Sequence, residues 1–486
     1  MNQKSFLLTL LLFAMLLVGC ADEELHIDAP TISGVEQAYS IIENGTIKLS
    51  PTIEGDNYVT YSWLIDEEVV ATTLEYTFEG KEVGEYELTF KATNNGGTTE
   101  SIIKITVYSA SNTMSIDTYT IVEIKLPAFV GEEDEVNIEV IESGSDIYRL
   151  TKNEEGTPLF VAAEAGRYVV ELSVNDLSVD YAITVAERDK EVSAYTAKVF
   201  DYLPAPGQFV NKMPVYDEGD THEDMLSKVE KAIVGSSASM ITLGGWGGYV
   251  TLGFDHTIVN VAGKRDFRIN GNSFAGSAEP GIVMVAYDKN NNGKPDEDEW
   301  YEIAGSGNFT AEKEEWYENA LKADGDLKTH RDYEMTFYRP EVEDNNASNE
   351  YIRWTNNKGQ EGYKVKNAFH KQSYYPLWVK DDKITFSGIR LADNGWDRSG
   401  SGSYYVLEYY SYGYVDNYPN NDTRSAIDID WAIDKDGNPA NLPGVDFVKV
   451  INGVDKENGW LGEASTEVSK GEDLHALGVD IDTVIE

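Results

Sequence analysis

The clearest structural signal in the sequence is "GEYELTFKATNNGG", from Gly84 to Gly97. Its large apolar side chains fall at every second position: Tyr86, Leu88, Phe90 and Ala92. A period of two places these side chains on one face of a β-strand and leaves the polar ones on the other. The closing "NNGG" supplies the residues that tight turns prefer. We therefore predict a half-buried antiparallel strand that ends in a turn.

The same alternation extends over residues 30–108. "YSWLI", from Tyr61 to Ile65, has the same period, and Trp63 stands in the middle of it, where a sandwich core would take a large ring. Short alternating runs separated by turn residues are typical of an antiparallel sandwich of the immunoglobulin type. We predict one such domain over residues 30–108.

A second copy of this plan follows. "AGRYVVELSVND", from Ala165 to Asp176, parallels "VGEYELTFKATN", from Val83 to Asn94, in its glycine, its tyrosine and its alternating apolar residues. We predict a second sandwich over residues 109–187, with the pair acting as a stalk. The alternative, a ligand-binding sandwich, would require clustered aromatic residues or a metal loop, and neither copy has them.

Residues 188–486 form a larger region with a different texture. One helix is indicated by "THEDMLSKVEKAIVG", in which Thr221 and Asp224 form a capping pair ahead of an apolar stripe: Met225, Leu226, Val229 and Ile233. The remainder consists of short strand patterns separated by Gly- and Asn-rich turns. Many strands without an alternation of strands and helices favour a jelly-roll-like β-sandwich. The predicted class of the whole chain is all-β with minor helices.

Longer motifs in this sequence resemble known bacterial families. "YSWLID" together with "GEYELTFKATNNGG" resembles the PKD-like modules of bacterial surface proteins. Four stretches of the last region resemble the "cell surface protein" lipoprotein family of gut Bacteroidetes, whose members carry PKD-like modules: "LGGWGGYVTLGFDHTI", "DFRINGNSF", "EPGIVMVAYDKNNNGKPDEDEWYEIAGS" and "GVDFVKVINGVDKENGWLGEASTEV". The resemblance implies a fold like that of carbohydrate-binding modules. It also implies proximity to an outer-membrane TonB-dependent transporter. Transporters for cobalamin-like cofactors belong to this class.

The first residues indicate where the protein is located. Residues 1–19 have a basic residue and an apolar run too short to span a membrane, as in a lipoprotein signal peptide. "LVGC" resembles a lipobox, and Cys20 is the single cysteine of the chain. We predict that Cys20 is lipidated; the alternative is a chance cysteine in an ordinary signal peptide. The acidic linker, residues 20–29, resembles an export tag for the cell surface, and the alternative is a solvated linker facing the periplasm.

The charge of the chain excludes several kinds of partner. The 486 residues include 85 acidic and 39 basic side chains, for a net charge of −46. Binding to nucleic acid or to an anionic membrane surface requires a cationic face, so we exclude both. Membrane attachment is then expected through the lipid alone. Divalent cations are the expected compensating partners for so many carboxylates.

One loop predicts a calcium site. "DKNNNGKPDEDE", from Asp288 to Glu299, matches the pattern D-x-[DN]-x-[DN]-G-x5-E. The predicted ligands are Asp288, Asn290, Asn292, the Lys294 carbonyl, Asp296 and Glu299. The flanking runs read as strands, so we predict a calcium loop in a hairpin; the alternative is a polar turn without metal. A second acidic stretch, "DIDWAIDKDGNPANL", lacks the closing acid and favours a tight turn.

Aromatic loops predict a ligand site, and catalytic motifs are missing from the sequence. The six histidines show no paired metal spacing, and the chain has neither a G-x-S-x-G elbow nor a P-loop. We predict no enzymatic activity. The predicted ligand contacts are Trp246, Tyr374, Tyr375, Trp378 and Trp396, whose rings suit a sugar face or a corrin edge. The alternative is that Tyr374, Tyr375 and Trp378 form core.

These observations predict a surface-exposed, lipid-anchored outer-membrane protein. Its C-terminal region would capture a glycan or a small molecule such as a cobalamin-like cofactor for uptake. The alternative is a structural or adhesive surface protein that binds host or matrix proteins. A glycoside hydrolase or lyase ranks third, because no pair among so many carboxylates stands out as acid and nucleophile.

Overall fold

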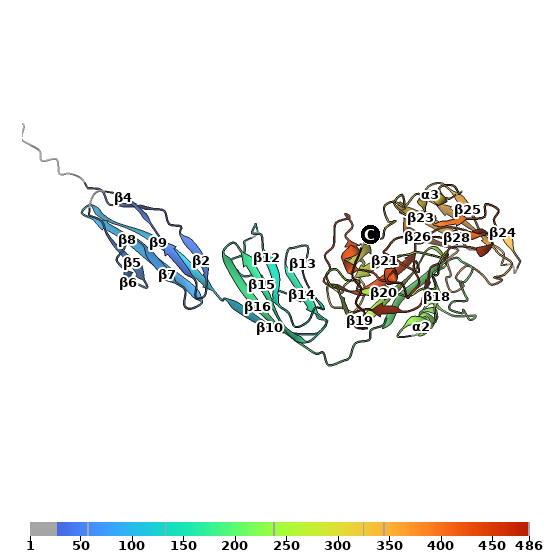
Figure 1. Cartoon of the computed structure of the whole chain (residues 1–486), viewed down its shortest axis with the longest axis horizontal. Coiled ribbons are helices and arrows are strands. Elements are labelled where there is room, and N and C mark those ends of the chain that lie inside the picture. The colour runs from blue at the N-terminus through green and yellow to red at the C-terminus, as the bar shows by residue number, and fades with distance from the viewer. Residues whose placement is uncertain are drawn as a thin grey trace, which may run out of the picture. The chain divides into compact units, whose positions relative to one another are not determined.

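A computed structural model describes most of the chain (Figure 1), over residues 27–55, 58–131, 133–236, 239–323, 325–343 and 346–484. The predicted signal peptide and Cys20 lie outside these residues. The internal contacts of the chain define two compact units: residues 1–112, 127–137 and 171–180 in the first, and 113–126, 138–170 and 181–486 in the second. Within the described residues, no helix is long and apolar enough to cross a membrane.

Strands β1 to β9 fold as a sandwich, with the bounds Thr31–Ser33, Ala38–Ile42, Thr46–Leu49, Thr52–Glu54, Thr60–Ile65, Glu68–Ala71, Tyr76–Glu79, Gly84–Asn94 and Gly97–Tyr108. One sheet has the order β2-β9-β8-β5-β6, while β3 pairs with β7 and β1 with β4. Trp63 on β5 is fully buried, and its ring centroid lies 4.5 Å from that of Phe90 on β8. The predicted core position of Trp63 is confirmed.

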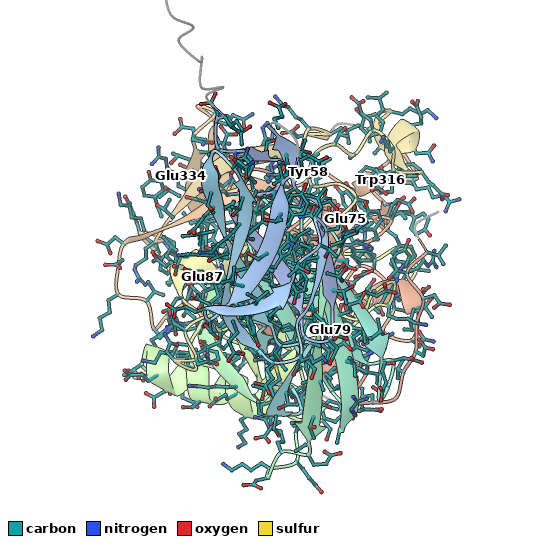
Figure 2. All side chains as sticks on the ribbon, turned by 90° about the vertical axis from the view of Figure 1, so that its left-hand side faces the viewer. Tyr58, Glu75, Glu79, Glu87, Trp316 and Glu334 are labelled. Carbon is teal, nitrogen blue, oxygen red and sulfur yellow. The ribbon has the colours of Figure 1, made fainter. Side chains whose placement is uncertain are left out.

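Acidic side chains occupy the outer faces of these strands. Glu75, Glu79 and Glu87 are exposed, as Figure 2 shows, and Glu75 pairs with Lys48 at 2.8 Å. The alternation of the sequence thus separates apolar residues inside from charged ones outside.

Strands β10 to β16 repeat the plan, with the bounds Ser111–Asp117, Val122–Glu123, Asn137–Glu142, Tyr148–Lys152, Pro158–Ala162, Gly166–Val174 and Leu177–Ala186. Their sheets have the orders β10-β16-β15-β12 and β11-β14-β13. The tyrosines of the two aligned motifs make the same contact: Tyr86 Oη donates to the Glu82 carbonyl at 2.9 Å, and Tyr168 Oη to the Glu164 carbonyl at 3.0 Å. This bond back to the chain four residues upstream is the corner typical of such sandwiches.

The rest of the chain contains β17 to β33, with the bounds Lys198–Ala205, Ile241–Thr242, Gly245–Val259, Phe267–Ile269, Gly281–Ala286, Trp300–Ile303, His330–Tyr338, Ser348–Asn356, Glu361–Lys366, Lys383–Arg390, Gly395–Asp397, Tyr405–Leu407, Tyr414–Val415, Ala432–Ile433, Gly444–Asn452, Glu467–Val468 and Gly471–Asp473. A large sheet has the order β17-β19-β31-β21-β22-β30, with β29 paired to β21, and a second has the order β25-β24-β23-β26. The prediction of an all-β chain built from sandwich-like domains is confirmed.

Helices are few and short. Helix α2 is His222–Ile233, and Thr221 and Asp224 form the predicted capping box at its start. Met225, Val229 and Ile233 bury its apolar face in the core of the large sheet. The other helical segments among the described residues are α3, Tyr317–Ala320, and four 3-10 turns: η1, Glu297–Glu299; η2, Thr423–Ser425; η3, Ile429–Trp431; and η4, Gly459–Leu461.

Candidate functional site

The predicted calcium loop joins two neighbouring strands. β21 and β22 pair antiparallel, with Ala286 opposite Trp300, so Asp288 to Glu299 form the connection of a hairpin. This confirms the strand character of both flanks. Asp446 on β31 accepts a hydrogen bond from the Asp288 backbone N at 2.7 Å and thereby fixes the start of the loop on the neighbouring strand.

The side chains of the loop turn inward. Asp288 accepts the backbone N–H groups of Asn292 at 2.9 Å and Gly293 at 2.6 Å. The amides of Asn290 and Asn292 meet Asp296 Oδ2 at 2.7 and 2.6 Å. Gly293 has φ +73°, a conformation that glycine adopts without strain. Four of the predicted ligands therefore converge on one small volume.

The last acidic residue, Glu299, holds the two ends of the loop together. Glu299 is 1% exposed, and its two oxygens accept the backbone N–H groups of Lys289 at 2.9 Å and Asp296 at 3.1 Å. The Lys294 backbone N donates to Asn292 Oδ1 at 2.8 Å, which tightens the bend. Each carboxylate oxygen that accepts one hydrogen bond retains a lone pair for a cation. The donor set fits calcium, which binds oxygen atoms only.

The second acidic stretch forms a turn. Asp434 Oδ1 accepts the backbone N–H groups of Asp436 at 2.9 Å and Asn438 at 2.8 Å. Asp428 lies apart from this turn and accepts the hydroxyl of Thr483 at 2.5 Å. The prediction that this stretch forms a tight turn is confirmed for Asp434 to Asn438.

Four of the five predicted ligand aromatics lie in the core. Tyr374 and Tyr375 are fully buried, while Trp246 and Trp378 are 1% and 6% exposed. Trp246 packs edge-on against Tyr333 at 4.8 Å and donates its Nε1–H to the Ile389 carbonyl at 3.0 Å. This burial corrects the prediction for these four rings, since protein atoms cover the faces that a ligand would need. The alternative, that they are core, was correct for Tyr374, Tyr375 and Trp378.

Trp396 differs from these rings because it is partly exposed. It lies on β27, which pairs with β28. Its Nε1–H donates to Glu408 Oε1 at 3.3 Å. Glu408 in turn lines a cleft that the sequence did not reveal.

This cleft has a volume of about 880 Å³, and aromatic and charged side chains line it. Its aromatic members are Trp316, labelled in Figure 2, and three tyrosines: Tyr409, Tyr412 and Tyr418. Tyr409 and Tyr412 are partly exposed, whereas Trp316 is 3% exposed and holds the wall through a 2.9 Å hydrogen bond to the Tyr409 carbonyl. Such a wall offers ring faces to a ligand.

Two arginines accompany the tyrosines of the cleft. Arg424 lies over the Tyr418 ring at 4.1 Å, and Tyr418 packs against Tyr409 with a centroid separation of 4.5 Å. Arg265 lies over the Trp431 ring at 5.2 Å, and Trp431 packs against Tyr412 at 4.9 Å. Five of these residues lie between Tyr409 and Trp431, whereas Arg265 comes from a segment far away in the chain, so no sequence pattern joins Arg265 to the tyrosines.

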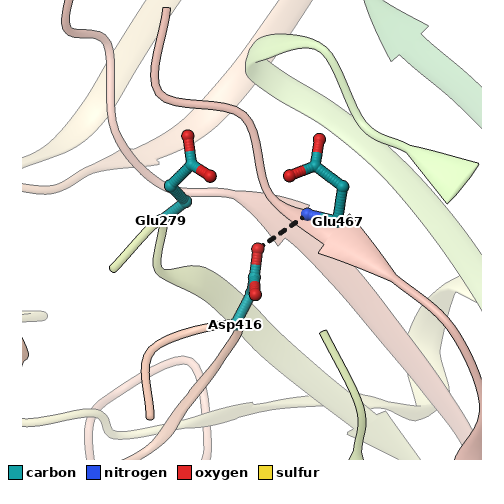
Figure 3. Close-up of side chains that lie close together, drawn as sticks. All are labelled: Glu279, Asp416 and Glu467. Carbon is teal, nitrogen blue, oxygen red and sulfur yellow. Dashed lines mark hydrogen bonds between the residues drawn. The ribbon is translucent and has the colours of Figure 1, made fainter. Parts of the chain in front are cut away.

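A buried acidic cluster lies outside the cleft (Figure 3). Glu279, Asp416 and Glu467 form the one group of three acidic or metal-ligating side chains, among the described residues, whose ligand atoms lie within 4.8 Å of one another. Asp416 accepts three backbone N–H groups, from Asn272 at 2.7 Å, Ser273 at 2.8 Å and Glu467 at 2.9 Å. It therefore holds three segments together.

The surroundings of the three carboxyl groups favour their protonated forms. Burial raises the pKa of Asp416 to about 7. Burial, followed by repulsion from Glu467 and Asp416, raises the pKa of Glu279 well above its ordinary value. Burial and the Asp416 charge do the same to the pKa of Glu467. Carboxylates this close cannot all be ionised without a compensating charge.

Comparison with known proteins identifies part of the chain. Residues 30–94 match the family model of the PKD-like domain. This match confirms the PKD-like interpretation for those residues. No curated protein matches the chain.

Several solved structures match parts of the chain at low sequence identity. The titin I-band fragment I67–I69 is 14% identical with a TM-score of 0.19, and the alignment covers 33% of this chain and 66% of that one, so the chain spans just under two thirds of the fragment. The PKD domain of human KIAA0319 is 13% identical with a TM-score of 0.16, covering 19% and 91%. The fibronectin(III)-like modules of Clostridium thermocellum CbhA are 14% identical with a TM-score of 0.18, covering 33% and 96%.

Proposed function

We propose that this protein is a non-enzymatic, lipid-anchored surface protein whose C-terminal region captures a glycan or a small molecule for uptake. The observation that carries the proposal is the cleft lined by Tyr409, Tyr412, Arg424 and Glu408. Its volume of about 880 Å³ lies within the range of small-molecule sites, ~300–1,000 Å³. Ring faces bind the apolar faces of sugars or corrin-like macrocycles, and charged groups fix the polar substituents.

The location follows from the sequence and belongs to the same proposal. Cys20 would carry the lipid, and the acidic linker after it would direct the protein to the outer surface of the outer membrane. The net charge of −46 leaves the lipid as the sole membrane attachment. The resemblance to the Bacteroidetes lipoproteins supports a TonB-dependent transporter as partner, with a glycan or a cobalamin-like cofactor as cargo.

We also propose that the Asp288 loop binds calcium. Asp288, Asn290, Asn292, Asp296 and Glu299 would supply side-chain oxygens. The Lys294 carbonyl would complete the set. The ion would neutralise the carboxylates of the loop and fix the hairpin between β21 and β22, which is a structural role.

Binding measurements with cleft variants test the proposed function. The purified chain and its Tyr409→Ala and Tyr412→Ala variants would be screened on a glycan array and against cobalamin. Tyr363→Ala is the control, because Tyr363 is 44% exposed on β25 and does not line the cleft. We expect at least one probe to bind the wild type and the control equally and the two cleft variants more weakly. Equal binding by all four proteins would place the ligand elsewhere.

A further inference from the structure

Arg265 is an unusual residue of the cleft wall because it is buried and forms no ion pair with any of the described residues. It is 5% exposed, and none of the described acidic side chains lies within 4.0 Å of its guanidinium. Its Nη1 donates to the carbonyls of Thr423 at 3.2 Å and Ala426 at 3.0 Å, and its Nε has no hydrogen-bond partner in the part of the chain that the structure describes. The Trp431 ring covers one face of the guanidinium.

The desolvation cost of the buried Arg265 charge is not offset by a hydrogen-bonded anion among the described residues. Burial lowers the pKa of Arg265. The negative charges of Asp428 and Asp422 act in the opposite direction and raise this pKa, without a hydrogen bond to the guanidinium. An arginine nevertheless keeps its charge inside proteins. A buried cation without a hydrogen-bonded anion carries an uncompensated desolvation cost, and an anionic group of a ligand would remove it.

A second arginine, Arg424, directly follows Thr423, whose carbonyl accepts a hydrogen bond from Arg265. Thr423, which holds Arg265, is followed by Arg424 in η2, and both side chains line the cleft. Arg424 makes a two-pronged contact with Asp422 at 3.0 and 2.7 Å, so its charge is already paired. Of the two arginines in this wall, Arg265 is therefore the one that forms no ion pair with the described residues.

Acidic groups also face the cleft. Glu314 is 6% exposed and accepts hydrogen bonds from the Ser411 backbone N at 3.1 Å and hydroxyl at 2.9 Å. Burial raises the pKa of Glu314. Glu408 holds Trp396. These carboxylates suit the hydroxyl groups of a ligand, whereas the arginines suit an anion.

We propose that the cleft takes a ring compound that carries an anionic group, a carboxylate or a phosphate, and that this group faces Arg265. This inference rests on the proposed function and names the chemical class of its ligand. The ring of the ligand would lie against Tyr409 and Tyr412. Paired N–H donors make arginine the residue best matched to both anions.

The experiment compares charged and neutral sugars of similar size. Isothermal titration calorimetry would measure the binding of a glucuronate-containing disaccharide, of glucose 6-phosphate and of maltose to the full chain. We expect one of the two anions to bind at least ~10-fold more tightly than maltose, and which of them does so distinguishes carboxylate from phosphate. The preference should weaken as salt rises, because screening reduces charge interactions.

Two variants locate the anion. Arg265→Gln should abolish the preference for the anion, and Arg424→Gln should reduce it. Arg353→Gln is the matched control, since Arg353 is an exposed arginine on β24, paired with Glu361 and absent from the cleft wall. If Arg265→Gln fails to fold, Arg424→Gln decides the question, because its side chain is 53% exposed.

The outcomes separate this inference from the proposed function. Binding of maltose and both anions with equal affinity, lost in Tyr409→Ala, overturns the anionic ligand and leaves the capture function standing. An anion preference that survives both arginine variants also overturns the inference. Failure of all three sugars, of the array probes and of cobalamin to bind overturns both.

Discussion

Replacing Glu279 by glutamine should stabilise the C-terminal region at alkaline pH. The Glu279 carboxylate lies against Asp416 and Glu467, and Ser465 N donates to its Oε1 at 2.9 Å. Glutamine retains an oxygen for that hydrogen bond and removes the charge. The variant therefore relieves repulsion without breaking the recorded contact.

The magnitude follows from the linkage between proton binding and folding. A carboxyl whose pKa rises on folding contributes stability that is complete below its unfolded pKa and is lost as pH rises through its folded pKa. For Glu279, burial and the charges of Glu467 and Asp416 raise the pKa well above its ordinary value of 4.5. Each pH unit between the unfolded and the folded pKa costs about 1.4 kcal/mol of unfolding free energy, and coupling within the cluster reduces this cost. We expect Glu279→Gln to recover about 1–3 kcal/mol of unfolding free energy at pH 8 and little at pH 4.

Calorimetric unfolding at pH 4, 5, 6, 7 and 8 would measure this effect. The wild type should lose stability toward pH 8, and Glu279→Gln should lose less. Glu334→Gln is the control, because Glu334, labelled in Figure 2, is exposed on β23. A Glu279→Gln variant that is less stable than the wild type at pH 8, or equally dependent on pH, would refute the raised pKa values of the acidic cluster.

Three further predictions concern the loop, the anchor and the buried rings. Calcium should raise the melting temperature of the wild type by mass action, and Glu299→Gln or Asp288→Ala should remove most of this rise while Asn291→Ala should not; identical curves in chelator and in millimolar-range calcium would mean a turn without metal. Cys20→Ser should abolish metabolic lipid labelling and release the protein from the membrane fraction or leave it unprocessed, and unchanged fractionation with label would contradict the anchor. Tyr374→Ala should destabilise the C-terminal region by ~3–5 kcal/mol in chemical denaturation, as expected for truncating a buried ring, whereas unchanged stability would contradict its core role.

Local patterns predicted the fold well because each rests on neighbours in the sequence. The alternation around Phe90 produced β8, and the pairing of Thr221 with Asp224 started α2. The inward turn of the Asp288 loop likewise follows from one stretch of twelve residues.

The sites formed by distant residues could not be predicted. The cleft joins Arg265 to Tyr412, and the acidic cluster joins Glu279 to Glu467, through pairings that only the folded sheets define. The sequence also did not reveal which aromatic rings are buried. Tyr374 sits in a polar stretch that resembles a ligand loop, yet its ring is fully buried beside Tyr351, with a centroid separation of 5.4 Å.

A crystal structure of the chain with its tightest-binding sugar or corrinoid tests the capture function most directly. We expect the ligand in the cleft, with a ring face against Tyr409 or Tyr412 and a polar oxygen within hydrogen-bond distance, ~3 Å, of Arg265 or Arg424. A ligand bound elsewhere, with the cleft empty, would contradict this expectation.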